Sequence, residues 1–232
     1  MTAVVPLRDG VSGKSRLAAA LDPAARRRLV VALARHVLDV LAGCAAVDRV
    51  VVVTADPAFV GRVLAADEDP VGRTTPDRQP GLPNRARRAD LVAEPAGRPG
   101  LNAALEHARA VVRDGAEPGR LLVVHADLPL LTAADVAAVL AEPVDVVIAT
   151  DRHGTGTNLL VVPSSAGRGG FAFRFGAGSR AAHEREASAA GLTCAVVDRP
   201  GTALDLDTLA DWDDLPPLVR RRLRVDVGAT PG

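Results

Sequence analysis

Positively charged residues gather where the first apolar run of the chain ends. The run Ala3 to Leu7 leads into RDGVSGKSR, which holds Arg8, Lys14 and Arg16 beside two glycines. Lys14 is the only lysine in a chain whose other basic residues are arginines, and an ammonium binds phosphate as a compact point charge. Three cations and free backbone amides in one loop favour binding of a triphosphate. The alternatives are a solvated turn with charged tips and a chance surface lysine.

The loop departs from the P-loop pattern although it contains Gly13-Lys14-Ser15. That motif requires a glycine five positions before Gly13, where this chain has Arg8. Gly10 comes two residues too late to replace it. We therefore expect phosphate contacts without the P-loop wrap.

A carboxylate follows the apolar run Leu121 to Ala126 directly. Asp127 stands at the end of a predicted central strand, where packing does not explain it. Mg²⁺ prefers such hard oxygen ligands and is often held by one or two carboxylates together with substrate phosphates. Asp127 is therefore a candidate metal ligand, and a local turn former before Pro129 is the alternative.

A second acidic pair lies in LDLDT near the end of the chain. Thr208 with Asp211 resembles a helix start, and Asp207 is placed to support that cap or the helix dipole. Asp205 has no such local task and is the better metal candidate. In extended geometry Asp205 and Asp207 share a face, so Asp207 stays a second candidate.

Three further segments combine glycine with polar side chains. Residues 151–158 read DRHGTGTN before a strand, and residues 174–179 read RFGAGS, which puts Ser179 at a helix start. Free amides there favour an anion, while a glycine-rich turn capped by Ser179 explains the same residues without a ligand. Gly100 and Asn102 are candidates to contact a base or ribose, or they merely begin a helix.

Other chemistries find little support in the residue pattern. The five histidines nowhere reach the spacing of zinc ligands, and no nucleophile elbow is present. Equal numbers of basic and acidic residues argue against a nucleic-acid or membrane surface. Cys44 and Cys194 lie far apart, which is typical of buried thiols in a reducing cytoplasm. Nothing in the sequence determines the oligomeric state.

The predicted elements alternate between valine-rich strands and amphipathic helices, a pattern typical of an α/β fold with a mainly parallel sheet. We predict helices after Asp22 and Asp56, which precede prolines, and one after Thr132, which forms a capping box with Asp135. Three more helices are expected at 101–113, 178–190 and from Thr208 onward. The predicted strands are 3–7, 49–54, 121–126, 144–150, 159–163 and 194–198.

The chain is long enough for one large domain, which we place at 1–224. Residues 69–90 are polar and rich in proline, glycine and arginine, so they are predicted to form a mobile insertion within it. Residues 225–232 are predicted to fray.

Taken in order, VVPLRDGVSGKSRL, GLNAAL, HADLPLLT, DRHGTGTN, FRFGAGS and LDLDT resemble the 2-phospho-L-lactate or phosphoenolpyruvate guanylyltransferase family of coenzyme F420 biosynthesis. The likeness spans nearly the whole chain. Its most specific part is GTGTN together with RFG-x-x-S. The resemblance implies a single-domain, Rossmann-like nucleotidyltransferase fold of the glycosyltransferase-A kind, with a central sheet flanked by helices.

The resemblance also implies roles for individual residues. Asp127 and Asp205 would hold Mg²⁺, and the amino-terminal loop with Lys14 would hold the phosphates of GTP. The acid substrate would be bound by Thr157, Gly176 and Ser179. Arg8 stands where relatives often carry a lysine.

The implied reaction transfers GMP from GTP to phosphoenolpyruvate or 2-phospho-L-lactate and releases pyrophosphate. We favour phosphoenolpyruvate by analogy with bacterial relatives. The rivals are a nucleotidyltransferase for a sugar phosphate, methylerythritol phosphate or molybdopterin, and a non-catalytic nucleotide-binding module. The paired carboxylates Asp127 and Asp205 argue against the module.

Overall fold

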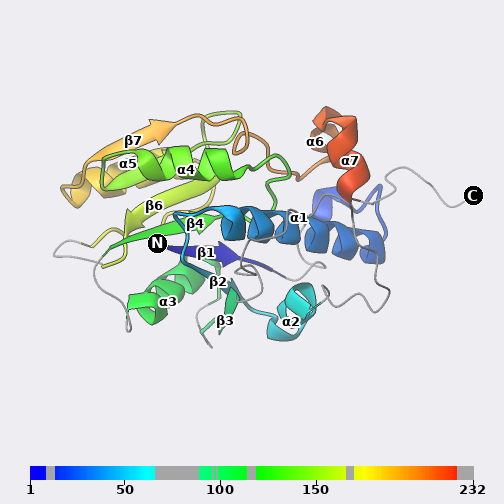
Figure 1. Cartoon of the computed structure of the whole chain (residues 1–232), viewed down its shortest axis with the longest axis horizontal. Helices are drawn as coiled ribbons and strands as arrows, with labels where there is room; N and C mark the ends of the chain where they lie inside the picture. The colour runs from blue at the N-terminus through cyan, green and yellow to red at the C-terminus, as the bar shows by residue number, and fades with distance from the viewer. Residues whose placement is uncertain are drawn as a thin grey trace, which may run out of the picture.

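The computed structural model describes residues 1–8, 14–65, 89–95, 97, 99–113, 119–165 and 170–223. Within them, strands form one sheet in the order β3-β2-β1-β4-β6-β5-β7, with helices on both faces (Figure 1). The strands are β1 (Thr2–Pro6), β2 (Arg49–Thr54), β3 (Ala89–Ala93), β4 (Arg120–Val124), β5 (Val146–Ala149), β6 (Leu159–Pro163) and β7 (Cys194–Val197). The helices are the 3₁₀ turn η1 (Ser15–Leu17), α1 (Pro23–Gly43), α2 (Pro57–Ala65), α3 (Leu101–Arg113), α4 (Ala133–Ala141), α5 (Ser179–Ala189), α6 (Leu209–Asp214) and α7 (Pro217–Leu223).

The sheet is mainly parallel, as predicted. β1, β2, β3 and β4 pair in parallel, and so do β5 and β7. β6 alone runs antiparallel to its neighbours β4 and β5. The chain returns from β5 to β6 through the short segment 150–158, which has no room for the helical crossover that a parallel pair requires.

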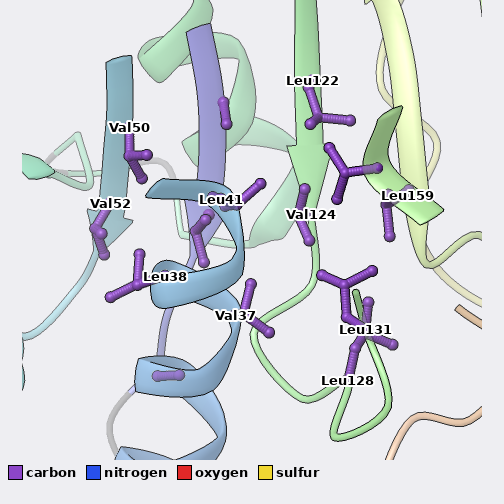
Figure 2. Packing of buried hydrophobic residues seen from close by; sticks show 14 of the residues in the cluster. Val37, Leu38, Leu41, Val50, Val52, Leu122, Val124, Leu128, Leu131 and Leu159 are labelled. Atoms are coloured by element: carbon purple, nitrogen blue, oxygen red, sulfur yellow. The ribbon is translucent and has the colours of Figure 1, made fainter. Parts of the chain in front are cut away.

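Two hydrophobic clusters fill the two faces of the sheet. On one face α1, α2 and α4 pack against β1, β2 and β4, and on the other face α3 and α5 cover the same sheet. Figure 2 shows Val37, Leu38 and Leu41 of α1 against the valines of β2 and β4. The central strands are therefore buried on both faces, as their unbroken apolar runs predict.

A third cluster joins the end of the chain to the start of α1. Leu204, Leu206 and Trp212 pack against Leu29 and Leu33. Because Leu204 and Leu206 are buried and alternate with two aspartates, Asp205 and Asp207 are left less buried between them. This packing fixes the second acidic pair relative to the sheet.

The predicted helix starts are confirmed. Asp22 accepts a hydrogen bond from the N–H of Ala25, and Asp56 accepts one from Phe59. Capping boxes join Thr132 with Asp135 and Thr208 with Asp211. The side chain of Ser179 does not cap α5, because Gly178 is the N-cap residue and adopts a left-handed backbone.

Two sequence predictions are wrong in detail. Ala89 and Asp90 belong to β3 rather than to the end of the predicted insertion, and this strand was not predicted. Its side chains are intermediate or exposed, and Leu91 is 41% exposed, so the edge strand lacks a strong apolar signal. Cys194 is exposed rather than buried. The remainder of the predicted insertion, residues 69–88, and the predicted tail lie outside the described residues.

Among the described residues, no helix is both long and apolar enough to cross a membrane.

Candidate active site

Lys14 joins two carboxylates from distant parts of the chain. Its Nζ donates to Asp127 Oδ2 at 2.5 Å and to Asp207 Oδ1 at 2.6 Å. Lys14 follows β1 and Asp127 follows β4, and these strands are parallel neighbours, so both residues lie at the carboxyl edge of the sheet. This is the edge at which open α/β sheets bind ligands.

A backbone hydrogen bond brings the second acidic pair to the same place. The N–H of Leu206 donates to the carbonyl oxygen of Asp127 at 3.0 Å. The residues on either side, Asp205 and Asp207, therefore lie beside the Asp127 turn. Asp127 and Asp205, predicted as a pair, share one neighbourhood, because the negative charge of Asp127 acts on Asp205.

The ion pairs determine the charge state of the cluster. Burial alone would lower the pKa of Lys14, but Asp127 and Asp207 outweigh it and raise that pKa above its ordinary value. Burial likewise would raise the pKa of Asp127, and Lys14 holds it below its ordinary value. Both groups are therefore ionised at neutral pH.

Asp205 lies in a different environment. Burial raises its pKa, and the negative charges of Asp127 and Asp207 raise it further. Hydrogen bonds from its own backbone and from the side chain of Asn158 act in the opposite direction. Asp205 is therefore a carboxylate that would gain from a cation nearby.

The cluster borders a cavity of about 220 Å³. Lys14, Asp127, Asp207, Arg8 and His125 line it together with apolar residues of β1, α1 and α3. Asp127 Oδ1 and His125 Nε2 are buried and have no hydrogen-bond partner within the described chain. Unpartnered buried polar atoms at a cavity wall indicate a ligand-binding position.

The donor set fits a hard divalent cation. Asp127, Asp205 and Asp207 offer only carboxylate oxygens, which are the ligands that Mg²⁺ prefers. In the part of the chain described, no three His, Cys, Asp or Glu side chains converge as a ready-made metal site. A cation here would therefore complete its ligand shell with oxygens from a bound substrate.

The other predicted nucleotide contacts lie in different surroundings. Arg8 lines the cavity, whereas Arg16 is exposed on η1, and residues 9–13 between them are outside the description. Asn102 donates to the carbonyl oxygen of Phe175 at 3.0 Å and accepts the N–H of Phe175 at 2.8 Å. Asn102 thus fixes the 171–178 segment to the start of α3. Gly100 precedes that start with a φ of 122°.

The residues predicted to bind the acid substrate belong to a buried network. Ser179 Oγ donates to Thr157 Oγ1 at 3.2 Å, and both residues are at most 3% exposed. His183 Nε2 accepts the N–H of Arg174, so Nδ1 carries the proton and donates to Thr157 Oγ1 at 3.0 Å. Gly176 lies nearby with a φ of 142°. Their contact with a substrate stays a prediction.

This network adjoins the cavity through its neighbours. The ring of Phe175 lies 5.1 Å from that of His125 and 4.8 Å from that of His183. Asn158 follows Thr157 and bonds to Asp205. The two groups of predicted site residues are therefore adjacent.

Sequence reasoning missed two residues that shape the site. It treated His125 as a strand residue, although its position two residues before Asp127 places it at the cavity. It also gave no role to Arg152, whose guanidinium forms an ion pair with Asp211. Asp211 Oδ2 in turn accepts the N–H of Asp207 at 2.9 Å, so Arg152 helps to position Asp207. No local pattern indicates this pairing across 59 residues.

Comparisons with known proteins show the family of the chain. A family model described as "Guanylyl transferase CofC like" matches residues 83–216. The phosphoenolpyruvate guanylyltransferase of Rubrobacter xylanophilus is 38% identical over 215 residues, covering 90% of each chain. The 3-phospho-D-glycerate guanylyltransferase of Phenylobacterium zucineum is also 38% identical, over 90% of this chain and 86% of that protein.

Solved structures share the fold at low sequence identity. A nucleotide-diphospho-sugar transferase, described as putative, from Desulfovibrio desulfuricans has a TM-score of 0.69 at 15% identity, covering 96% of this chain and 93% of that one. A nucleotidyl transferase from Methanothermobacter has a TM-score of 0.59 at 18% identity, covering 97% and 98%. The predicted nucleotidyltransferase fold is thereby confirmed.

Proposed function

Because the chain belongs to the CofC-like guanylyl transferase family, we propose that it transfers GMP from GTP to phosphoenolpyruvate in coenzyme F420 biosynthesis. Pyrophosphate is the other product. The observation that carries the proposal is the cluster of Lys14 with Asp127 and Asp207, beside Asp205, at a cavity of the nucleotidyltransferase fold.

The reaction needs no covalent enzyme intermediate. A phosphate oxygen of the acid attacks the α-phosphorus of GTP, a new P–O–P linkage forms, and the bond to the β-phosphate oxygen breaks. The nucleophile is already an anion at neutral pH, so no general base has to remove a proton. The chain's task is to align two anionic substrates and to offset their charge.

The residues of the site divide this task. Lys14 and Arg8 offer positive charge to the triphosphate, and Arg16 supplies a further cation from η1. Asp127 and Asp205 would hold Mg²⁺, with Asp207 as an additional oxygen donor, and the ion would neutralise polyphosphate charge when bound. Asp127 Oδ1, buried and unpartnered, supports this assignment.

We assign the acid substrate to the group of Thr157, Gly176 and Ser179, which lies next to the cavity. Two of these residues have buried hydroxyls, and the Phe175 ring connects their network to His125 at the cavity. Gly100 and Asn102 begin α3 on the same side, and Leu101 lines the cavity, so we retain them as contacts of the nucleoside. We place the activity in the cytoplasm, where the free thiols Cys44 and Cys194 persist.

The identity of the acid is the finer question. One relative is named for phosphoenolpyruvate and another, equally identical, for 3-phospho-D-glycerate. Both acids carry a phosphate and a carboxylate on three carbons, as does 2-phospho-L-lactate. Phosphoenolpyruvate and 2-phospho-L-lactate carry the phosphate on the carbon next to the carboxylate and would use the same contacts. In 3-phospho-D-glycerate the phosphate is one carbon farther from the carboxylate, so specificity rests on this spacing and on the carbon skeleton.

Pyrophosphate release measures the proposed reaction directly. The purified protein is incubated with Mg²⁺, one of GTP, ATP, CTP or UTP, and one of the three acids. We expect release with GTP and phosphoenolpyruvate at the highest kcat/KM. Release with 3-phospho-D-glycerate alone would identify that acid, rather than phosphoenolpyruvate, as the substrate. No release with any of the acids would overturn the proposed function.

A further inference from the structure

Lys14 lies between the carboxylates to which the divalent cation is assigned. Its Nζ is 2.5 Å from Asp127 Oδ2 and 2.6 Å from Asp207 Oδ1, and its side chain is 7% exposed. Asp127 has its second oxygen buried without a partner. The carboxylates therefore already hold a positive charge that belongs to the chain.

We propose that Lys14 is an internal counter-ion that competes with a divalent cation for Asp127 and Asp207. In the nucleotide-free protein the ammonium occupies the carboxylates and weakens metal binding. Nucleotide phosphates attract the ammonium away, and the metal then binds strongly. The inference rests on the proposed function for the identity of the nucleotide.

Charge at the site favours this exchange. One ammonium faces Asp127 and Asp207, with Asp205 close to both. A triphosphate has the charge sign that attracts Lys14 and repels the carboxylates. When the ammonium turns toward the phosphates, three carboxylates are left that require a cation, so metal and nucleotide each strengthen the other's binding.

The backbone of Lys14 supports the same view. Its φ of 60° lies in the left-handed region, which residues with a side chain rarely adopt. Within the described chain, the other positive φ values belong to glycines. The two ion pairs hold Lys14 in a backbone conformation that its Cβ disfavours, and release of the ammonium removes that restraint.

A purely structural ion pair makes a different prediction. If Lys14 only anchors the Asp127 turn to the Asp207 segment, its removal should loosen the site and leave metal affinity equal or weaker. Competition requires the opposite sign, because removal of the ammonium exposes the carboxylates. Metal affinity without nucleotide therefore separates the two roles.

The test measures Mn²⁺ binding by electron paramagnetic resonance of the free ion. Lys14→Met is compared with wild type and with Arg8→Met, which removes a charge from the same cavity without breaking an ion pair to these carboxylates. Without nucleotide, we expect about tenfold tighter Mn²⁺ binding in Lys14→Met, as for the loss of a close charge pair, and a change of about twofold or less in Arg8→Met. With a non-hydrolysable α,β-methylene analogue of GTP, wild type should approach the Lys14→Met affinity.

Equal Mn²⁺ affinity in Lys14→Met and Arg8→Met would overturn the proposal. Should Lys14→Met fail to fold, as judged by circular dichroism, the wild-type protein supplies the answer. Lys14 is the only lysine, so ¹³C-lysine labelling of the untagged chain gives a single side-chain signal. That signal should shift with the GTP analogue and, at higher concentration, with Mg²⁺ alone. A signal that responds to neither would contradict the exchange.

Neither measurement depends on turnover. A protein that shows the competition but releases no pyrophosphate keeps this inference and loses the proposed function. A protein that turns over GTP without the competition keeps the function and loses the inference.

Discussion

The three carboxylates near Lys14 differ in how far a positive charge compensates their negative charge. Lys14 forms ion pairs with Asp127 and Asp207. Asp205 has these two negative charges as neighbours and forms no ion pair with a cation in the part of the chain that the structure describes. Its raised pKa means that the folded protein holds the Asp205 proton more tightly than the unfolded chain does. At neutral pH the ionised Asp205 therefore lowers the stability of the fold, while its carboxylate lies next to Asp127 and Asp207 at the site.

Asp205→Asn should stabilise the protein without ligands. We expect a gain on the order of 0.5 kcal/mol in the free energy of unfolding at pH 7, because Asp205 is only partly buried and solvent screens the repulsion. A group with a raised folded pKa binds more protons when folded, so stability falls as pH rises through its titration. The difference between Asp205→Asn and wild type, measured by urea unfolding, should shrink as pH falls below that pKa. A destabilised variant at pH 7 would contradict this account.

The sequence indicates individual candidate residues of the site, but it does not indicate which of them form ion pairs. Lys14 could be singled out because arginine replaces lysine everywhere else, and Asp127 because it ends a buried strand. The bond from Lys14 to Asp207 spans 193 residues and depends on how the third hydrophobic cluster seats the final segment. No local pattern contains that information.

Among the helices, α4 and α6 begin with capping boxes of similar chemistry, but only the capping box of α6 lies next to the site. In each, a nearly buried aspartate caps a helix and faces a partly exposed arginine: Asp211 with Arg152 at α6, and Asp135 with Arg199 at α4. Only Asp211 also accepts the N–H of a residue that contacts Lys14. Comparing substitutions of Asp211 and Asp135 therefore distinguishes an effect on helix stability from an effect on the geometry of the site.

Asp211→Ala and Asp135→Ala should each cost about 1 to 2 kcal/mol of stability, since each removes the side-chain bonds of a helix cap. Only Asp211→Ala should also lower kcat/KM, by about tenfold, because Asp207 loses its backbone restraint. Urea unfolding and pyrophosphate release measure the two effects. Equal activity losses in both variants would show that Asp211 acts on the fold alone.

The elements themselves were predicted with uneven success, for physical reasons. β2 and β6 begin and end as their apolar runs predict, since buried strands leave an unbroken signal. β3 was missed because an edge strand with exposed side chains resembles a loop. The reversed direction of β6 was also missed, although the short segment before it carried the signal.

At the scale of the whole molecule, the half-buried His36 and the fully buried His183 link stability to pH. Burial and the charge of Arg222 lower the pKa of His36 to about 4, and burial and the charge of His125 lower that of His183 to about 4. Both values lie below the ordinary value near 6.5, so the unfolded chain binds more protons between these limits. Stability should therefore decrease as pH falls from 6.5 to 4.

His183 should contribute on the order of 2 to 3 kcal/mol to this decrease, because it is fully buried and its protonation would break the bond from Arg174. Urea unfolding at pH 7 and pH 4.5 measures the slope. His183→Gln should flatten it, with the exposed His153→Gln as the matched control. An unchanged slope in His183→Gln would show that other groups dominate.

We propose that Asp127 is a reaction-centre residue of a guanylyltransferase. The most direct test is pyrophosphate release from GTP and phosphoenolpyruvate by Asp127→Asn, compared with Asp213→Asn, whose carboxylate is exposed on α6. We predict a loss of about 10²-fold or more in kcat for Asp127→Asn, only modestly weaker GTP binding, and wild-type turnover in the control. Wild-type turnover in Asp127→Asn would contradict the account.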